Sequence, residues 1–565
     1  MTSALVLALR RLRAPLIALI VIYALAILGL VLIPGQDAAG NPTRVGFFHA
    51  LYFVSYTATT IGFGELPFTF TDAQRLWVTC MIYASVVGWA FVIGKLLALL
   101  NDKGFLQAMR LRRFATQVRR IGEPFYLVTG YGETGQLLCR ALDRLDVRFV
   151  VLDISEDRIA ELGVENYRTD PPALAADASQ PETLLLAGLR HDACQGVIAL
   201  TNSDSANLAA AIAVRLLNPS IPVLARADAR ETAANMASFG TDHIVYPFER
   251  FGEYLASAID TPASCRLMEL LVGVPGWRPR PDSEPPHGHW VVCGYGRFGR
   301  EVVKSLNREG LDVTIIEPDP TEVPGLRRVH GQGTEAHTLV EAGVLDAVGI
   351  VAGTDDDVNN LSIAMTAVGL KHDLYVVLRQ NLHANRALFE AFRGHLVMVP
   401  SEIIAHEIFA LITTPLMSRF LRIVKEKDNL WADALAQRLL GEVGADISAA
   451  WSVRIDRTGA PAVLAAVGVA GAEVALEILL HDPRVRDRIV AAVPLLLVRA
   501  EAELPLPAAT VHLRAGDHIL FAGTRRARAL QTLTLRNANV LDYVRTGRDA
   551  PGGWIWQWLS RRQAA

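Results

Sequence analysis

Cysteine is scarce in this chain, and neither sign of charge is in large excess. Only five cysteines occur among 565 residues, and none of them forms a Cys-x-x-Cys pair. This pattern argues against a disulfide framework or a zinc site and suits a reducing compartment. The formal net charge is -3, which gives no reason to expect a nucleic-acid partner. Charged residues make up 20% of the chain and hydrophobic residues 51%, a balance on the apolar side for a soluble protein.

The apolar residues are concentrated in two uncharged runs near the N-terminus, residues 15–33 and 76–94. As a helix, each run would be about 28 Å long, close to the ~30 Å thickness of a bilayer's hydrocarbon core. A secretory signal is the alternative for the first run, but no A-x-A cleavage site follows it and a second run does. Two membrane spans are therefore predicted, at about residues 15–33 and 76–100.

Basic residues predict the orientation of these spans. Three arginines precede the first span, and seven basic residues follow the second between positions 95 and 120. The connection between the spans carries only Arg44 and Arg75. Because basic residues favour the cytoplasmic side, both termini are expected in the cytoplasm, with the protein in a bacterial inner membrane.

Between the spans lies an apolar segment, residues 45–61, that is too short to cross the membrane and return. It reads as a re-entrant pore helix, and non-helical backbone at this depth must line a water-filled path. The sequence Thr-Ile-Gly-Phe-Gly follows at positions 60–64. Gly62 and Gly64 accept backbone angles that other residues resist, so a row of carbonyl oxygens can face a dehydrated cation.

This arrangement resembles the two-transmembrane potassium channels, whose filter usually reads TVGYG followed by Asp. The resemblance implies potassium ions in a filter formed by four copies of the loop. It assigns the filter to Thr60, Ile61, Gly62, Phe63 and Gly64. This chain departs from the usual pattern because Phe63 lacks a phenol and Glu65 replaces Asp.

Two glycines in the second span, Gly88 and Gly94, are candidates for a gating hinge. The alternative is close helix packing, because glycine is frequent in membrane helices.

The remainder of the chain contains a tandem repeat. A strand, a Gly-x-Gly-x-x-Gly turn and a helix begin near residue 125, and the same pattern returns near residue 289. Gly130 and Gly294 are 164 residues apart, as are the acids Asp153 and Glu317. Further on, matching polar residues are 153 positions apart. In this fingerprint the glycines admit phosphates to a helix N-terminus, and the acid binds a ribose hydroxyl.

The repeats resemble the RCK (TrkA-N type) domains that regulate potassium channels and transporters. The whole chain is similar to the tandem-RCK prokaryotic potassium channels of the GsuK type. The acids favour a free ribose hydroxyl, and so NAD or an adenine nucleotide (ADP or ATP) as cofactor rather than NADP. Fingerprint and resemblance together give the candidate nucleotide-binding residues: Gly130, Gly132, Gly135, Asp153, Asp177, Thr201, Arg226, Gly294, Gly296, Arg297, Gly299, Glu317, Thr354 and Arg379. The alternative is that one or both clefts are empty and only mediate assembly.

The predicted fold is an α-helical two-span pore domain with a re-entrant loop, followed by two α/β Rossmann-type domains and a small α+β lobe. The predicted boundaries are a pore domain at 1–100 with pore helix and filter at 45–65, a gating linker at 101–124, a first RCK domain at 125–262, a linker at 263–288, a second RCK domain at 289–425, a C-terminal lobe at 426–545 and a tail at 546–565.

The predicted function is a homotetrameric, potassium-selective channel in a lipid bilayer, gated by nucleotide bound to a cytoplasmic RCK ring. One alternative is gating by calcium or another ion, with nucleotide as a structural ligand. A regulatory subunit of a potassium transporter is another. An NAD-dependent oxidoreductase would need an acid/base constellation beside the nicotinamide, and none stands at matched positions in both repeats.

Overall fold

The computed structural model describes residues 3–37, 41–65, 69–272, 277–279, 284–319, 325–444, 449–468 and 473–547. The chain divides into two compact units, Met1–Arg120 and Ile121–Ala565. Most of the predicted tail, from residue 548 onward, lies outside the described residues.

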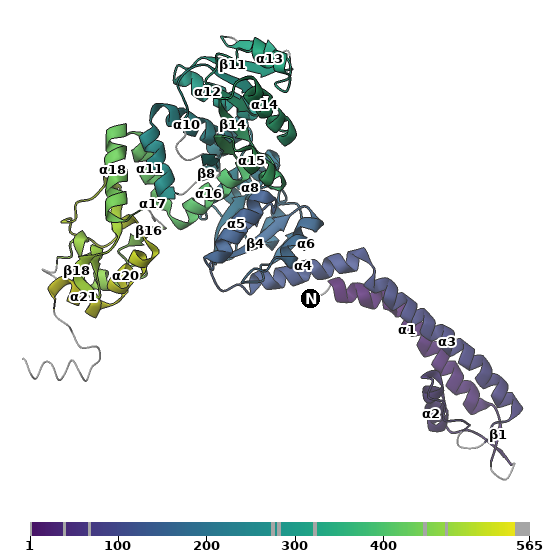
Figure 1. Cartoon of the computed structure of the whole chain (residues 1–565). Helices are drawn as coiled ribbons and strands as arrows, with labels where there is room; N and C mark the ends of the chain where they lie inside the picture. Colours follow the sequence, from purple (N-terminus) through teal and green to yellow (C-terminus); the bar gives the residue numbers. More distant parts are fainter. Residues whose placement is uncertain are drawn as a thin grey trace, which may run out of the picture. The chain divides into compact units, whose positions relative to one another are not determined.

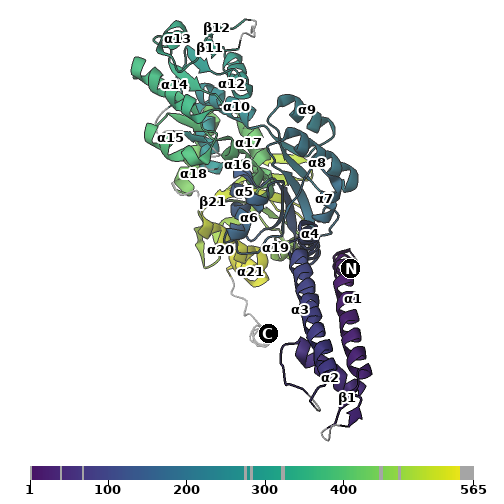
Figure 2. The ribbon, with the colours of Figure 1, turned by 90° about the vertical axis from the view of Figure 1, so that its right-hand side faces the viewer.

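The first unit is built on two long helices that run side by side (Figures 1 and 2). Two windows within these helices, Leu12–Leu32 and Asp72–Ala98, are long and apolar enough to cross a membrane. Most of their side chains are exposed, as expected for a surface that faces lipid or other subunits. The elements of this unit are α1 (Ser3–Leu32), β1 (Gly35–Gln36), β2 (Pro42–Thr43), α2 (Phe47–Ala58), α3 (Asp72–Leu100) and α4 (Lys103–Arg119).

The short helix α2 packs against α1 through a small apolar core. Phe53 of α2 and Leu30 of α1 are both buried in this core, together with Phe70. The core fixes the chain that follows α2 near the ends of the long helices. The predicted gating linker contains the helix α4.

The second unit contains two Rossmann-type sheets, and both are mainly parallel. The first has the order β5-β4-β3-β6-β7-β8 and the second β12-β11-β10-β13-β14-β15-β9. The elements of the first are β3 (Phe125–Thr129), α5 (Glu133–Arg144), β4 (Arg148–Asp153), α6 (Glu156–Val164), β5 (Ala173–Ala175), α7 (Pro181–Leu186), β6 (Cys194–Ala199), α8 (Asp204–Leu217), β7 (Val223–Arg226), α9 (Arg230–Ser238) and β8 (His243–Val245).

The second sheet repeats this order of elements, except that the described residues between β11 and β12 contain no helix to match α6. It comprises β10 (Trp290–Cys293), α12 (Arg297–Arg308), β11 (Val313–Glu317), β12 (Arg327–His330), α13 (Ala336–Glu341), β13 (Gly349–Ala352), α14 (Asp357–Leu370), β14 (Tyr375–Arg379), the 3-10 helix η1 (His383–Asn385), α15 (Arg386–Phe392) and β15 (Leu396–Met398). Its outer strand β9 (Trp277–Pro279) is antiparallel to β15.

The two Rossmann domains exchange helices. Helix α10 (Pro247–Asp260), which follows the first sheet, packs on α12 of the second domain. Helix α16 (Pro400–Thr413), which follows the second sheet, packs on α5 of the first. Phe251 of α10 is therefore buried in the second domain's core, and Ile408 of α16 in the first domain's core. This reciprocal packing joins the two domains through their glycine-turn helices.

The C-terminal lobe has a four-stranded sheet of order β16-β21-β19-β20. Its elements, with the helices that lead into it, are α17 (Pro415–Lys425), α18 (Asn429–Glu442), β16 (Ala449–Arg454), α19 (Pro461–Val467), the 3-10 helix η2 (Leu476–Leu480), β17 (His481–Asp482), β18 (Val485–Ile489), β19 (Ala492–Arg499), β20 (Ala502–Pro505), β21 (His518–Gly523), α20 (Arg525–Arg536) and α21 (Ala538–Thr546).

The stretch 263–288, expected to be a linker, instead begins with helix α11 (Pro262–Val272) and includes β9. Leu267 of α11 is buried with Phe420 of α17 and with strands of the lobe. Helix α17, expected in the second RCK domain, therefore also contributes to the lobe's core. The proline-rich sequence after α11 favours a linker, and for this reason the helix was not predicted.

Candidate functional site

The predicted filter loop begins where α2 ends. The backbone N–H groups of Ile61 and Gly62 donate to the Tyr56 carbonyl, at 2.9 and 3.4 Å. Gly62 and Gly64 have φ values of 68° and 99°. An added Cβ on either glycine would meet nothing within 4 Å, so backbone conformation, not crowding, calls for glycine here. Thr60 has φ 65°, a left-handed conformation that the sequence did not predict for a threonine.

A tyrosine of α2 braces this loop. The Tyr56 hydroxyl donates to the Gly64 carbonyl at 2.5 Å. Its ring lies edge-on to Phe63, with ring centroids 5.3 Å apart. A phenol from α2 therefore supports the loop within the chain, although Phe63 itself has no hydroxyl.

Glu65, directly after the loop, joins it to the start of α3. Its carboxylate accepts from the Phe70 amide at 2.9 Å and from Arg75 Nε at 2.9 Å. The hydrogen bond from Arg75, together with that from Phe70, holds the pKa of Glu65 below its ordinary value. Glu65 thus anchors the C-terminal side of the loop as a carboxylate.

The two hinge candidates differ in their surroundings, and α3 is a continuous helix through both. A Cβ on Gly88 would lie 2.8 Å from Cδ1 of Ile22 in α1, whereas one on Gly94 would meet nothing within 4 Å. Gly88 is therefore a close-packing position in this structure. The hinge role stays a prediction for both.

The first glycine turn has the geometry that its sequence predicts. Gly130 has φ 95°, and a Cβ there would lie 2.7 Å from backbone atoms of Leu200 and Thr201. A Cβ on Gly135 would clash with the carbonyl oxygen of Gly130. Gly132 is the N-cap of α5.

The second turn repeats this geometry. Gly294 has φ 93°, and a Cβ on Gly299 would clash with the Gly294 carbonyl oxygen. Gly296 is the N-cap of α12, as Gly132 is of α5. In both turns, free backbone N–H groups at the helix N-terminus therefore point toward the place where a phosphate would bind.

The two predicted ribose-binding acids also hold the glycine turns. Asp153 accepts from the Tyr131 amide at 2.6 Å, and Glu317 accepts from the Tyr295 amide at 2.5 Å. Asp153 is almost fully buried, and Arg158 Nη1 lies 3.5 Å from it. In both domains the acid is therefore fixed beside the turn.

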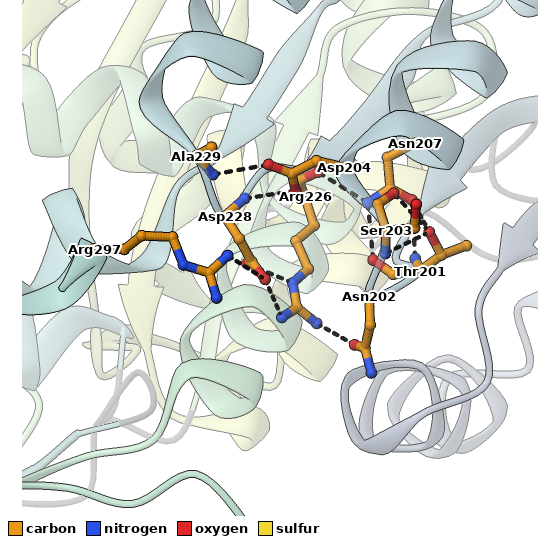
Figure 3. Close-up of polar contacts among 9 residues, drawn as sticks. All are labelled: Thr201, Asn202, Ser203, Asp204, Asn207, Arg226, Asp228, Ala229 and Arg297. Carbon is orange, nitrogen blue, oxygen red and sulfur yellow. Dashed lines mark hydrogen bonds and ion pairs between the residues drawn. The ribbon is translucent and has the colours of Figure 1, made fainter. Parts of the chain in front are cut away.

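A threonine–asparagine network fixes the next loop in each domain, and Figure 3 shows the network of the first domain. The Thr201 hydroxyl donates to Asn207 Oδ1 at 2.7 Å, and Asn207 Nδ2 donates to the Arg226 carbonyl at 3.1 Å. The second domain repeats both contacts, at 2.7 Å from Thr354 to Asn360 and at 2.8 Å from Asn360 to the Arg379 carbonyl. The hydroxyls of Thr201 and Thr354 thus organise their own loops.

The arginines predicted at matching positions have different partners. Arg226 binds Asp228 through two hydrogen bonds of 2.8 Å, and its Nη1 donates to Asn202 (Figure 3). Arg379 instead lies over the rings of Phe248 and Phe298, 5.0 and 5.8 Å from their centroids. Burial lowers the pKa of Arg379 to about 10, which leaves it protonated at neutral pH.

Asp177 and its counterpart Gln332 are also used differently. Asp177 accepts from the Ser179 amide at 2.9 Å, and hydrogen bonds from Ser179 lower its pKa. The backbone contact is shared, because the carbonyls of Asp177 and Gln332 accept from the Gln180 and Glu335 amides. The two domains therefore present different side chains at this point.

Two contacts between the domains were not anticipated. Arg297, the residue after Gly296, reaches across to Asp228 of the first domain at 3.7 Å (Figure 3). Glu133, the residue after Gly132, accepts from the His383 amide of the second domain at 3.0 Å. The sequence holds one sign of these contacts, because Glu133 and Arg297 stand at matching positions of the two turns and carry opposite charges. Only the fold shows that each faces the other domain.

The second cleft also has a cavity. It measures about 140 Å³ and is lined by the turn residues Tyr295 and Gly296 and the acid Glu317, with Arg300 and Arg328. This cavity lies between the predicted phosphate-binding turn and the predicted ribose-binding acid, as a dinucleotide site requires.

No group of three or more His, Cys, Asp or Glu side chains suited to a metal ion occurs in the part of the chain that the structure describes. Three consecutive acids stand at positions 355–357, and carboxylates of this kind are also calcium ligands. Asp356 is the N-cap of α14 and accepts from the Asn359 amide at 2.7 Å, so helix capping accounts for it. Asp357 instead accepts from the Asn381 amide at 2.6 Å and so holds the loop after β14.

Comparison with known families identifies the domains. Residues 16–101 match the ion channel family model, and residues 126–247 and 290–400 both match the TrkA-N domain model. The chain thus joins a membrane ion channel domain to two TrkA-N domains, as the sequence predicted.

Two relatives from Methanocaldococcus jannaschii are similar to this chain in sequence. The chain is 25% identical over 227 residues to "Potassium channel protein 1" and 28% identical over 231 residues to "Probable potassium channel protein 2". These matches cover 40% and 41% of this chain and 66% of each relative, just under two thirds of their length. The chain is homologous to these channel proteins, and neither of them is described as an enzyme.

Solved structures with a similar fold include the "GsuK Channel", with a TM-score of 0.47 and 17% identity over 95% of this chain and 100% of that one. Another is the "GsuK channel bound to NAD", with a TM-score of 0.46 and 18% identity over 93% of this chain and 98% of that one.

Proposed function

We propose that this protein is a potassium-selective channel of a bacterial inner membrane, gated by a nucleotide bound in its TrkA-N domains. The observation that carries the proposal is the loop at residues 60–64. It lies between two apolar helices, with Gly62 and Gly64 both in the left-handed region. Such backbone supports a row of carbonyl oxygens that replaces the water around a potassium ion.

A homotetramer supplies the rest of the pore. Ile61 and Phe63 are each 60% exposed, so the filter loop presents open apolar surface that is unfavourable in a single chain. Four copies around one axis would cover this surface and place four loops about one ion path. Both termini and both TrkA-N domains would then lie in the cytoplasm, as the distribution of basic residues indicates.

Gating would follow from nucleotide bound at the glycine turns, with NAD or an adenine nucleotide as the ligand. The helix exchange between the TrkA-N domains joins their glycine-turn helices, so a ligand at either turn acts on both domains. Moving a pore from 1:99 to 99:1 open needs about 5.5 kcal/mol of differential binding. Four subunits would share this, at about 1.4 kcal/mol each.

The test is potassium flux from liposomes that hold the purified full chain, with and without NAD or ADP. Potassium-selective flux that changes with nucleotide, and loses this response in Gly132→Asp or Gly296→Asp, supports the proposal. Flux that no nucleotide changes would support the pore and contradict nucleotide gating. If no potassium passes under any condition, the channel proposal fails and a regulatory subunit of a potassium transporter becomes the better interpretation.

A further inference from the structure

The two glycine turns share their backbone but differ in one charge. Glu133 is the first residue of α5, directly after Gly132. Arg297 is the first residue of α12, directly after Gly296. The two turns therefore present opposite charges at matching places.

This position decides how a turn meets a diphosphate. A helix N-terminus carries partial positive charge and unpaired N–H groups that bind anions. A guanidinium there adds a strong, charge-assisted partner for phosphate oxygens. A carboxylate there offsets the helix dipole and repels the same oxygens.

The Glu133 carboxylate also has a hydrogen-bond partner in the other domain. It accepts from the His383 amide of the second domain at 3.0 Å. A diphosphate at the first turn would have to approach this carboxylate or displace a contact between the domains.

A second observation is an unpartnered hydrogen-bond donor at the second domain. Among the described residues, the buried Nε of Arg379 has no hydrogen-bond partner. Arg297 and Arg379 both lie over the ring of Phe248, at 6.0 and 5.0 Å. Asp355, Asp228 and Asp357 lie near enough to offset part of the charge of Arg379.

In the first domain the matching arginine is paired. Arg226, the counterpart of Arg379, is held by both oxygens of Asp228. The position that matches Asp228 in the second domain is Asn381, which is neutral. A buried guanidinium nitrogen without a partner favours an anionic ligand close by.

We propose that the two clefts are not equivalent: the second binds the diphosphate of an adenine nucleotide through Arg297, and the first binds no diphosphate and serves assembly. This inference rests on the proposed nucleotide gating and assigns it to one domain. Glu317 suits a ligand with a free ribose hydroxyl, such as ADP or NAD. On binding, Arg297 leaves Asp228 for the diphosphate, so the ligand weakens a contact between the domains.

The experiment is calorimetric titration of the full chain in detergent micelles with ADP. Wild-type protein is expected to bind one ADP per chain. Arg297→Gln is expected to weaken binding at least tenfold, and the matched change Glu133→Gln to alter it less than threefold. Because this readout needs no ion flux, it can fail while the channel proposal stands, and the reverse also holds.

Two equal sites per chain, no ADP binding at all, or Arg297→Gln binding within threefold of wild type would overturn the inference. A second measurement needs no variant. Photolabelling of the wild-type chain with 8-azido-ADP is expected to mark peptides from residues 290–335. Labelling confined to residues 126–180 would overturn the inference even if Arg297→Gln fails to fold.

Discussion

Arg297, in the glycine turn of the second TrkA-N domain, lies 3.7 Å from Asp228 of the first. Asp228 is also the bidentate partner of Arg226, so one buried carboxylate holds two guanidinium groups from different domains. A movement of Arg297 at the second turn therefore changes the charge environment of Asp228 and Arg226 in the first domain.

Replacing Asp228 is expected to destabilise the second unit, Ile121–Ala565. Asp228→Ala leaves Arg226, whose side chain is 15% exposed, without its carboxylate partner. Breaking a buried pair in this way costs about 3–5 kcal/mol. Chemical denaturation of the full chain in detergent measures the loss.

The surface pair of Arg148 and Glu123 provides the matched control. Their side chains are 40% and 65% exposed, so Glu123→Ala is expected to cost less than about 1 kcal/mol. Equal losses for the two variants would contradict the role assigned to Asp228.

The filter loop is expected to tolerate no side chain at Gly62. Gly62→Ala places a Cβ at φ 68°, which costs about 1–2 kcal/mol in the left-handed conformation and turns carbonyl oxygens away. Potassium flux should fall at least tenfold. Gly441→Ala is the control, because this glycine lies in α18, outside the first unit, its Cβ would meet nothing within 4 Å, and flux should persist. Equal flux in both variants would exclude residues 60–64 as the filter.

The brace from Tyr56 is expected to affect selectivity more than stability. Tyr56→Phe removes the donor to the Gly64 carbonyl, a hydrogen bond worth about 0.5–1.5 kcal/mol. The potassium-to-sodium permeability ratio should fall while the chain still folds. Tyr52→Phe, on the same helix but 55% exposed, should leave the ratio unchanged. An unchanged ratio in Tyr56→Phe would show that the brace has no role in selectivity.

The ionisation of Glu65 is expected to make potassium flux depend on pH. Its pKa lies below the ordinary value of 4.5 because Arg75 and the Phe70 amide bind the carboxylate. For a carboxyl group with a lowered pKa, the anchoring is intact above pH 4.5 and is lost as pH falls through the lowered value. Flux should therefore be unchanged from pH 7 to pH 5.

Arg75→Gln tests the cause of this shift. It removes the main partner of Glu65, so flux should begin to fall at a higher pH than in wild type. A wild-type loss already complete at pH 5, or no difference between the two proteins, would contradict the assignment.

The sequence was sufficient for much of this fold. Equal offsets predicted a repeat, and the repeat places Asn207 and Asn360 in matching networks with nearly equal distances. The two spans and the left-handed Gly62 and Gly64 also followed from sequence pattern and from the limits on backbone angles.

Other features depend on tertiary partners that a sequence pattern does not name. Periodicity shows that α10 and α16 have apolar faces, but not that each packs on the other domain's helix. In the same way, the packing of α11 could not be predicted from the stretch around it, because its core partners in α17, α18 and the lobe lie far along the chain; Leu271 and Leu416, for example, are 145 residues apart. The left-handed Thr60 depends on the loop around it, since its own residue type disfavours that conformation.

The most direct measurement of the central claim is the reversal potential of the reconstituted channel with potassium chloride on one side of a planar bilayer and sodium chloride on the other. The account predicts a current that reverses far from zero, toward the potassium equilibrium potential, and that Gly62→Ala abolishes. A current that reverses near zero, or one that survives in Gly62→Ala, would contradict a potassium filter at residues 60–64.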